Sequence, residues 1–180
     1  SDREKEFEQD MFPLNRVLFT YLGFFTAHHV SIIVGTTGGL LLSYGFGRSL
    51  GWLRASSLSL ALMYFLATTY GWLFIGTISA HAFAILPGLL WVLQVAATRH
   101  RYLLPILGGG LLLGIGFLAG FVQIIFYEYI LAGLFALYLD WTRYSQIVPL
   151  WKNLKISYTY AAITLGGLII GFPQWYPSAS

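Results

Sequence analysis

The chain has 180 residues, of which 57% are hydrophobic, 18% aromatic and only 9% charged, and its mean hydropathy is +0.71. Soluble domains carry about 25% charged residues, so this composition indicates a polytopic membrane protein. The absence of cysteine excludes disulfides and thiolate metal sites, and the net charge of +3 comes with no basic stripe that would bind nucleic acid.

Apolar segments of membrane-spanning length follow one another along the chain. Segments two to six suit a hydrocarbon core of about 30 Å. The first would be about 50 Å long as one helix, so we expect it to tilt, to start along the membrane surface, or to break at Gly35, Gly38 or Gly39. The segments are Leu14–Phe46, Arg54–Tyr70, Ala80–Ala97, Leu103–Gly120, Phe121–Trp141 and Leu154–Phe172. The sequence therefore predicts an all-α polytopic transmembrane helix bundle with about six membrane segments, formed by residues 13–180.

Basic residues fall in alternate connections between these segments. The other connections and the C-terminal stretch carry no Lys or Arg. By the positive-inside rule, the basic connections face the cytoplasm and both chain ends lie outside, in a multi-pass protein of the cell (inner) membrane. The basic residues are Arg48 and Arg54 in the first connection, Arg99 and Arg101 in the second, and Arg143, Lys152 and Lys155 in the third.

Residues 1–12 are acidic overall and lack the features of a signal peptide. We interpret them as the tail of an extracytoplasmic loop, with at least one spanning segment upstream of this chain. The alternative is a small intact protein whose short N-terminal tail crosses the membrane unaided.

Several stretches together resemble a known family. In order they are "FPLNRVLF", "GRSLGWLRASSLSLALMYFLATTYG", "SAHAFAILPGLLWVLQVA", "LAGFVQIIFYEYILAGLFALY" and "LGGLIIGFPQWYP". In this order they resemble successive regions of the GT-C superfamily of polytopic membrane glycosyltransferases, and the resemblance is closest to YfhO-like bacterial membrane proteins. It covers nearly the whole chain.

The resemblance implies a polyprenyl-phosphate sugar donor that enters from the bilayer, and sugar transfer at the extracytoplasmic face. It also implies that the catalytic acid lies on the first extracytoplasmic loop, most of which would precede this chain. The acidic residues of the N-terminal segment alternate with basic ones, as in an ordinary solvated run, so we assign no catalytic residue among them. They are Asp2, Glu4, Glu6, Glu8 and Asp10.

The connections without Lys or Arg carry aromatic and amide side chains that can stack on and hydrogen-bond a sugar. These residues predict a substrate-lining floor at the outer face, although ordinary interfacial residues would give the same pattern. The substrate-lining candidates are His81, Gln123, Gln174, Trp175 and Tyr176.

Glu128 interrupts the apolar stretch "GFVQIIFYEYIL", about 12 Å below the outer end of the fifth segment. A charged group at such depth costs about 2.5–3.5 kcal/mol on insertion scales, so we expect it to face the bundle interior and to have a partner, or to be protonated. The candidate partners are His28 and His29 in the first segment, or Gln94 or Thr36. A carboxyl that pins two helices and a polar lining of a substrate or proton path are both consistent with this placement.

The histidines do not predict a metal or haem site. His28 and His29 are adjacent, so on a helix they point about 100° apart. A haem needs axial ligands at matched depth on facing helices, whereas His81 lies at the outer edge and His28 about 20 Å inside the first segment. We therefore expect no metal and no cofactor.

The stretch "GGGLLLGIGFLAG" places Gly110 and Gly114, and Gly116 and Gly120, four residues apart. This GxxxG spacing lets helix backbones approach closely in a bilayer. No Lys-Ser/Thr follows, so the stretch is not a phosphate-binding loop. We expect close helix packing here.

Three function classes remain open. The first is membrane glycosyl transfer as part of a larger GT-C-like enzyme. The second is a transporter or channel component with Glu128 on the path, and the third is a non-catalytic integral membrane subunit of a complex. The expected partners are the lipid bilayer, a polyprenyl-phosphate sugar, and further segments of a longer chain or other membrane subunits.

Overall fold

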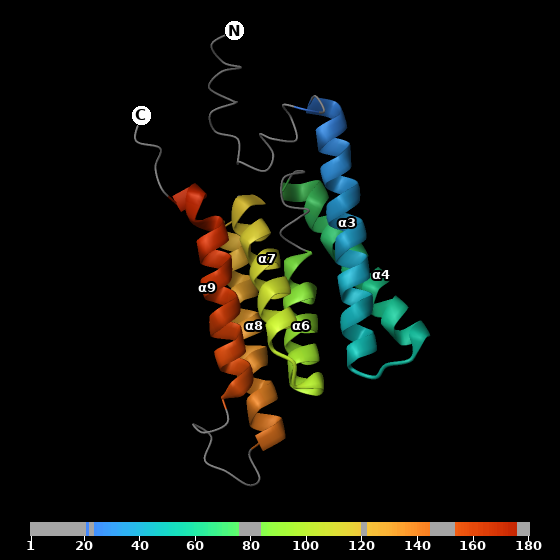
Figure 1. The fold of residues 1–180 in the computed structure, drawn as a ribbon. Helices are drawn as coiled ribbons and strands as arrows, with labels where there is room; N and C mark the ends of the chain where they lie inside the picture. The colour runs from blue at the N-terminus through green and yellow to red at the C-terminus, as the bar shows by residue number, and fades with distance from the viewer. Residues whose placement is uncertain (1–20, 22–23, 76–83, 120–121, 145–153, 176–180) are drawn as a thin grey trace.

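A computed structural model of the chain describes residues 21, 24–75, 84–119, 122–144 and 154–175. Its elements are all helices (Figure 1), so the all-α fold predicted from the sequence is confirmed for the described residues. Each of the six apolar segments corresponds to one of these helices. They are α3 (Phe24–Ser49), α4 (Arg54–Ile75), α6 (Ile85–Arg99), α7 (Leu103–Ala119), α8 (Val122–Tyr144) and α9 (Lys155–Trp175).

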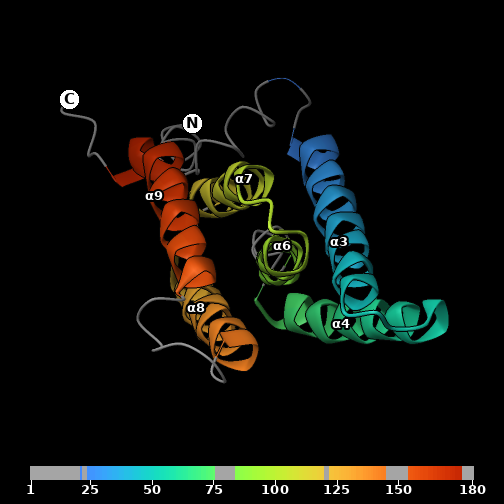
Figure 2. The ribbon, with the colours of Figure 1, turned by 60° about the horizontal axis from the view of Figure 1, so that its bottom comes forward.

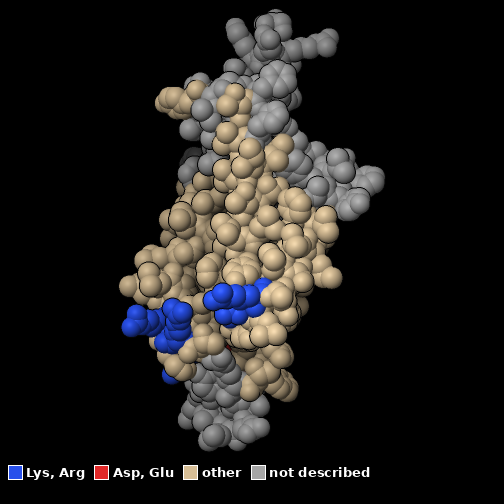
Figure 3. All heavy atoms as spheres, turned by 90° about the vertical axis from the view of Figure 1, so that its right-hand side faces the viewer, with Lys and Arg blue, Asp and Glu red and all other residues tan. Residues whose placement is uncertain are grey.

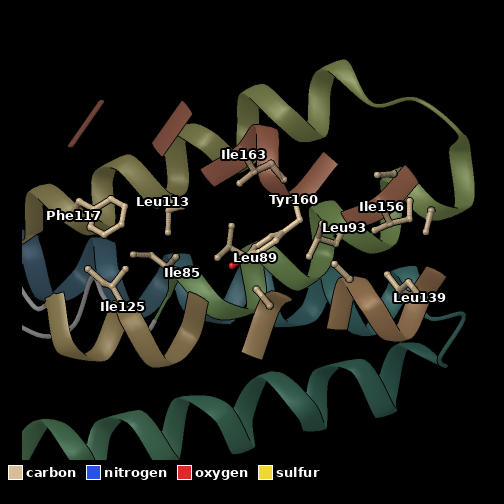
Figure 4. Packing of buried hydrophobic residues seen from close by; sticks show 14 residues of the cluster. Ile85, Leu89, Leu93, Leu113, Phe117, Ile125, Leu139, Ile156, Tyr160 and Ile163 are labelled. Atoms are coloured by element: carbon tan, nitrogen blue, oxygen red, sulfur yellow. The ribbon is translucent and has the colours of Figure 1, made fainter. Parts of the chain in front are cut away.

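Helix α6 is the central element. It contacts α3 on one side and α7, α8 and α9 on the other. Viewed from the end of the molecule (Figure 2), α6 to α9 form one group, and α3 and α4 form a pair beside it. Side chains of α6, α7, α8 and α9 meet in a common core, shown in Figure 4, in which Leu89, Leu93, Leu113, Ile125 and Ile163 are fully buried.

Helix α3 is continuous over the glycines at which we expected a break, so that expectation is wrong. Its glycines at Gly39, Gly45 and Gly47 instead pack against neighbouring helices. A Cβ on Gly39 would lie 3.8 Å from both Ala84 and Tyr64, and one on Gly47 would lie 3.0 Å from the Ser57 hydroxyl. Gly35, which is also buried, and Gly39 fall on the same face as Gly47, at four-residue spacing. The small side chains let α4 and α6 approach α3 without interrupting its hydrogen bonds.

Helices α7 and α9 pack closely along their length, as the glycine spacing predicted. A Cβ on Gly110 would lie 3.6 Å from the Cα of Gly166, and one on Gly114 would lie 2.5 Å from Ile170 Cγ2. The contact is reciprocal, because Leu113 lies 2.8 Å from where a Cβ on Gly167 would be. This part of the prediction is confirmed.

The second glycine pair has a different outcome. Gly116 faces Ile85 of α6 and Ile125 of α8 rather than α9. Gly120 lies outside the described residues. Glycines on both faces of α7 therefore allow it to pack between its neighbours.

Two of the described helices are long and apolar enough to cross a membrane, α8 over Ile124–Thr142 and α9 over Lys155–Phe172. Helices α4, α6 and α7 contain shorter apolar stretches. Large apolar side chains also cover the outer faces of the helices, with Leu134, Leu165 and Ile169 among the most exposed. The structure is therefore compatible with membrane association, and the six-span arrangement stays a prediction.

The described basic residues gather at one end of the helices. Figure 3 shows them as a band on one face of the molecule, with no acidic side chain visible there. The helix ends that the connections α3–α4, α6–α7 and α8–α9 join lie at the same end of the molecule, called the basic end below. The described basic side chains at helix ends are those of Arg48, Arg54, Arg99, Arg101 and Lys155.

Candidate functional site

Glu128 lies on the buried face of α8, as the sequence predicted. Only 5% of its surface is exposed, and Ile125 and Ala132, one turn away on either side, are fully buried. Helical spacing of three and four residues puts these three side chains on one face. The carboxyl therefore points into the helix assembly, away from the exposed side chains of the neighbouring Phe126 and Tyr127.

The carboxyl of Glu128 lies at the start of α6. The backbone N–H of Leu86 hydrogen-bonds to it. Helix α6 needs such an acceptor, because its N-cap residue, Ala84, offers no side-chain hydrogen bond and the first-turn N–H groups have no partner within the helix. Pro87 has no N–H, so Leu86 carries the last free donor of this turn. Glu128 thus takes the place of a local N-cap.

One carboxyl oxygen of Glu128 is open. Its Oε2 is buried and makes no hydrogen bond within the part of the chain that the structure describes. Tyr64 of α4 lies close enough to interact electrostatically with the carboxyl. Buried polar atoms are nearly always hydrogen-bonded, so an orphaned carboxyl oxygen among apolar helices calls for a donor. The open oxygen marks the place where a ligand group could bond.

The expected partners of Glu128 are only in part described. The side chains of His28 and His29 lie outside the described part of the structure, although their backbone belongs to α3. Along α3, the residue that contacts the start of α6 is Gly39. His29 precedes Gly39 by ten residues, about 15 Å of helical rise.

The two other expected partners, Thr36 and Gln94, do not bond to Glu128. The hydroxyl of Thr36 donates to the backbone oxygen of Ile32 at 2.7 Å, so it is satisfied within its own helix. Gln94 lies eight residues after Leu86, about 12 Å along α6, and its Oε1 is buried without a hydrogen bond among the described residues. These two alternatives, which required a shift of the helices, are not found: helical rise separates Gln94 from the carboxyl, and Thr36 bonds within its own helix.

The predicted substrate-lining residues cannot be placed as side chains. His81 and Tyr176 lie outside the described residues, and Gln123, Gln174 and Trp175 are described only as backbone of α8 and α9. The start of α8 and the end of α9 share the end of the bundle opposite the basic end (Figure 1). The backbones of Gln123 and Gln174 are therefore at the same end, as the sequence predicted.

Sequence reasoning missed the second buried acid, Asp140, which is 3% exposed. Its Oδ1 accepts from the N–H of Ile156 at 3.0 Å, and its Oδ2 accepts from the N–H and the hydroxyl of Ser157 at 2.8 and 2.6 Å. Asp140 therefore caps the N-terminus of α9 from α8. The sequence signal was available, because Glu128, Ala132, Ala136 and Asp140 recur at four-residue spacing.

A tyrosine pair fixes α8 against α9 between the two acids. The hydroxyl of Tyr160 donates to the backbone oxygen of Tyr129 at 2.5 Å, and the two rings lie 5.2 Å apart. Gly133 makes room for this contact, because a Cβ there would lie 3.1 Å from the Tyr160 ring. Helix α8 is thus held along its buried face, which keeps the position of Glu128 defined.

Among the described residues, no group of three His, Asp or Glu side chains gathers to hold a metal ion. No family model, no curated protein and no solved structure matches the chain.

Proposed function

We propose that this chain is the membrane-embedded part of a GT-C-like glycosyltransferase that uses a polyprenyl-phosphate sugar donor at the extracytoplasmic face. The order of the five stretches that resemble this superfamily supports the proposal. The all-α architecture and the helices of α8 and α9, which are long and apolar enough to span a membrane, are compatible with it.

In this proposal α3, α4, α6, α7, α8 and α9 all lie in the membrane, with the basic end in the cytoplasm. The exposed apolar faces would then contact lipid. Both ends of the chain would be extracytoplasmic, next to the end of the bundle at which α8 begins and α9 finishes. Glu128 lies six residues after the start of α8, about 9 Å from that end.

The open Oε2 of Glu128 is the observation that carries the proposed site. Of the two acids in the described part of the chain, Asp140 has both oxygens bonded, whereas Glu128 has one to offer. A sugar hydroxyl or an acceptor hydroxyl is a donor that suits a buried carboxyl, and such bonds are strong in a low-dielectric site. We assign Glu128 to substrate binding and leave the catalytic acid on the upstream loop.

The test uses the full-length protein reconstituted into liposomes with a polyprenyl-phosphate hexose, tritiated in the sugar. We expect label to leave the polyprenyl lipid for an acceptor only when protein is present. Glu128→Gln should lower the rate about ten-fold, because its single amide oxygen is taken by the N–H of Leu86 and the NH2 left at the open position cannot accept a hydrogen bond from a hydroxyl. If the wild-type protein leaves all label on the donor, the proposed function fails and the reading of a non-catalytic subunit takes its place.

A matched histidine pair tests the outer floor. His81→Asn should lower transfer, whereas His100→Asn, at the basic end, should leave it unchanged. Asparagine suits the control because His100 has a φ of 51° at the C-cap of α6, and Asn tolerates this left-handed conformation. Gln174→Ala should act like His81→Asn. If His81→Asn and Gln174→Ala both leave the rate unchanged, the floor is not the site.

The topology has its own test, which the absence of native cysteine makes simple. A single His100→Cys variant should resist a membrane-impermeant thiol reagent in sealed cells and react after the membrane is opened. Labelling of this residue from outside would overturn the cytoplasmic placement of the basic end.

A transport or channel role is the second candidate, supported by the same open carboxyl oxygen of Glu128. A path across the membrane needs further polar groups at other depths. Asp140 is the other described acid, and its oxygens are engaged by α9. This reading therefore has less support than sugar transfer.

A further inference from the structure

A groove of about 520 Å³ runs along the outside of the α3–α4 pair. Arg54, at the start of α4, marks its basic end, and Leu62 is the last residue of α4 along it. These two positions are eight residues apart, about 12 Å of helical rise. The lining comprises Leu40, Leu41 and Tyr44 of α3 and Arg54, Ala55, Leu58, Ala61 and Leu62 of α4.

The walls of the groove are apolar and open to the surroundings. Leu41, Leu58 and Leu62 are 64%, 53% and 48% exposed. Its volume falls within the range of ligand sites, about 300–1,000 Å³. An apolar channel of this kind beside membrane helices suits a hydrocarbon chain.

The only charged group of the lining is Arg54. Within the described part of the chain it makes no ion pair or side-chain hydrogen bond. The nearby Arg48 differs, because its guanidinium donates to the backbone oxygen of Trp52 and so belongs to the α3–α4 turn. Arg54 is an exposed residue at the end of the groove, so its charge is available there to an anion.

We propose that this groove binds one acyl chain of an anionic phospholipid, whose phosphate pairs with Arg54. A guanidinium suits a phosphate because its planar array of N–H donors bonds two oxygens at once. Basic residues at the level of the head groups attract anionic lipids, and Arg54 stands where the apolar walls end. This site lies on exposed side chains of α3 and α4, whereas Glu128 is buried on α8 near the end opposite the basic end, so the two sites share no residue.

The test exposes the purified full-length protein to equal amounts of phosphatidylglycerol and phosphatidylcholine with matched acyl chains, and counts retained lipids by native mass spectrometry. We expect the wild-type protein to keep one phosphatidylglycerol in preference to phosphatidylcholine. Arg54→Gln should reduce this preference about five-fold. Leu58→Trp, which fills the groove, should reduce retention of both lipids.

Two matched controls separate the groove from the general lipid belt. Arg101→Gln removes an exposed basic residue at the same end but outside the groove, and Leu134→Trp adds the same bulk to the exposed face of α8. Neither should change lipid retention. If Leu58→Trp changes the circular dichroism spectrum, Leu41→Trp at the opposite wall replaces it.

Equal retention of the two lipids by the wild-type protein would overturn the proposal. So would an equal loss of preference in Arg54→Gln and Arg101→Gln, which would mean that charge at this end acts without a site. A dimer mass that Leu58→Trp abolishes would assign the groove to a second copy of the chain instead.

Discussion

The two buried acids of α8 both accept hydrogen bonds from the first turn of another helix, and they differ in how many of these bonds they make. Asp140 and Glu128 are both buried, and each carboxyl lies at the first turn of another helix, α9 and α6 respectively. Asp140 accepts three hydrogen bonds with both oxygens. Glu128 accepts from the backbone N–H of Leu86, and its Oε2 has no hydrogen-bond partner among the described residues.

The N–H groups at helix starts inside this apolar assembly are satisfied by side chains of a different helix. Neither α6 nor α9 follows a residue with a capping side chain, since Ala84 and Leu154 precede them. Unpaired N–H groups are costly where water is absent. Helix α8 supplies the missing acceptors at two depths. At the start of α9, called the closed end below, both oxygens of Asp140 are bonded, so this contact is structural. At the start of α6, called the open end, Glu128 retains an oxygen that can accept a hydrogen bond from a ligand.

The largest effect is expected at the closed end. Asp140→Ala removes three hydrogen bonds and leaves the N–H groups of Ile156 and Ser157 without their acceptor. We expect the free energy of unfolding to fall by about 3 kcal/mol. The measurement is unfolding in mixed micelles of mild detergent and dodecyl sulfate, followed by circular dichroism.

Asp140→Asn is the control for that change. Its amide keeps one acceptor oxygen, so it should recover part of the loss. If Asp140→Ala costs no more than Asp140→Asn, the three bonds do not hold the start of α9 and the contrast with Glu128 disappears.

The second-largest effect is expected from side-chain packing, which holds α9 against α7 independently of the Asp140 cap. Gly114→Ala on α7 would place a Cβ 2.5 Å from Ile170 Cγ2, so we expect a loss of about 2 kcal/mol from overpacking. Gly108→Ala, on the same helix, meets nothing within 4 Å and should be neutral or slightly stabilising. The same unfolding assay applies. Equal behaviour of the two variants would show that α9 is not seated on α7 at Gly114.

The sequence was most informative about the helices. Long apolar runs, each with a basic connection at one end, predicted segments two to six within a few residues of α4, α6, α7, α8 and α9; the first segment differs more, because its early residues lie outside the described ranges. The spacing of Gly110 and Gly114 predicted the α7–α9 contact. The predicted break in α3 does not occur: a Cβ on Gly38 would meet nothing and one on Gly39 only ordinary contacts, and the helix runs on to tightly packed glycines at Gly45 and Gly47, a use of glycine that its local flexibility does not reveal.

The site was predictable only in part. The energetic cost of a carboxylate in an apolar segment was enough to place Glu128 on the inside. Its partner is a backbone N–H at the start of α6, and a search among titratable side chains could not find such a group. Asp140 was missed because it stands beside a basic connection, where an acid normally meets solvent. Which helix start it reaches depends on tertiary packing.

At the open end, two replacements of Glu128 test its hydrogen bond with the N–H of Leu86. Glu128→Gln keeps an acceptor for Leu86, so stability should change by less than about 0.5 kcal/mol. Glu128→Leu removes the acceptor and should cost about 1.5 kcal/mol, because the N–H of Leu86 loses its bond. The unfolding assay reads both. If the two variants have the same free energy of unfolding, the hydrogen bond between Glu128 and Leu86 does not contribute to stability, and Glu128 has no specific partner.

The smallest effect concerns a single bond of the closed end. Ser157 meets Asp140 twice, through its N–H at 2.8 Å and its hydroxyl at 2.6 Å. Ser157→Ala removes only the hydroxyl, and the backbone bond still pairs Oδ2, so we expect a loss of about 1 kcal/mol in the unfolding assay. The matched control is Ser59→Ala on α4, whose exposed hydroxyl donates to the backbone of Ala55 at 3.0 Å. In a background of Asp140→Ala the cost of Ser157→Ala should vanish, because its acceptor is gone. A cost that persists in that background would mean that the Ser157 hydroxyl stabilises the protein through another partner. The number of stabilising hydrogen bonds to Asp140 would then be smaller than three, and the difference from Glu128 would be smaller too.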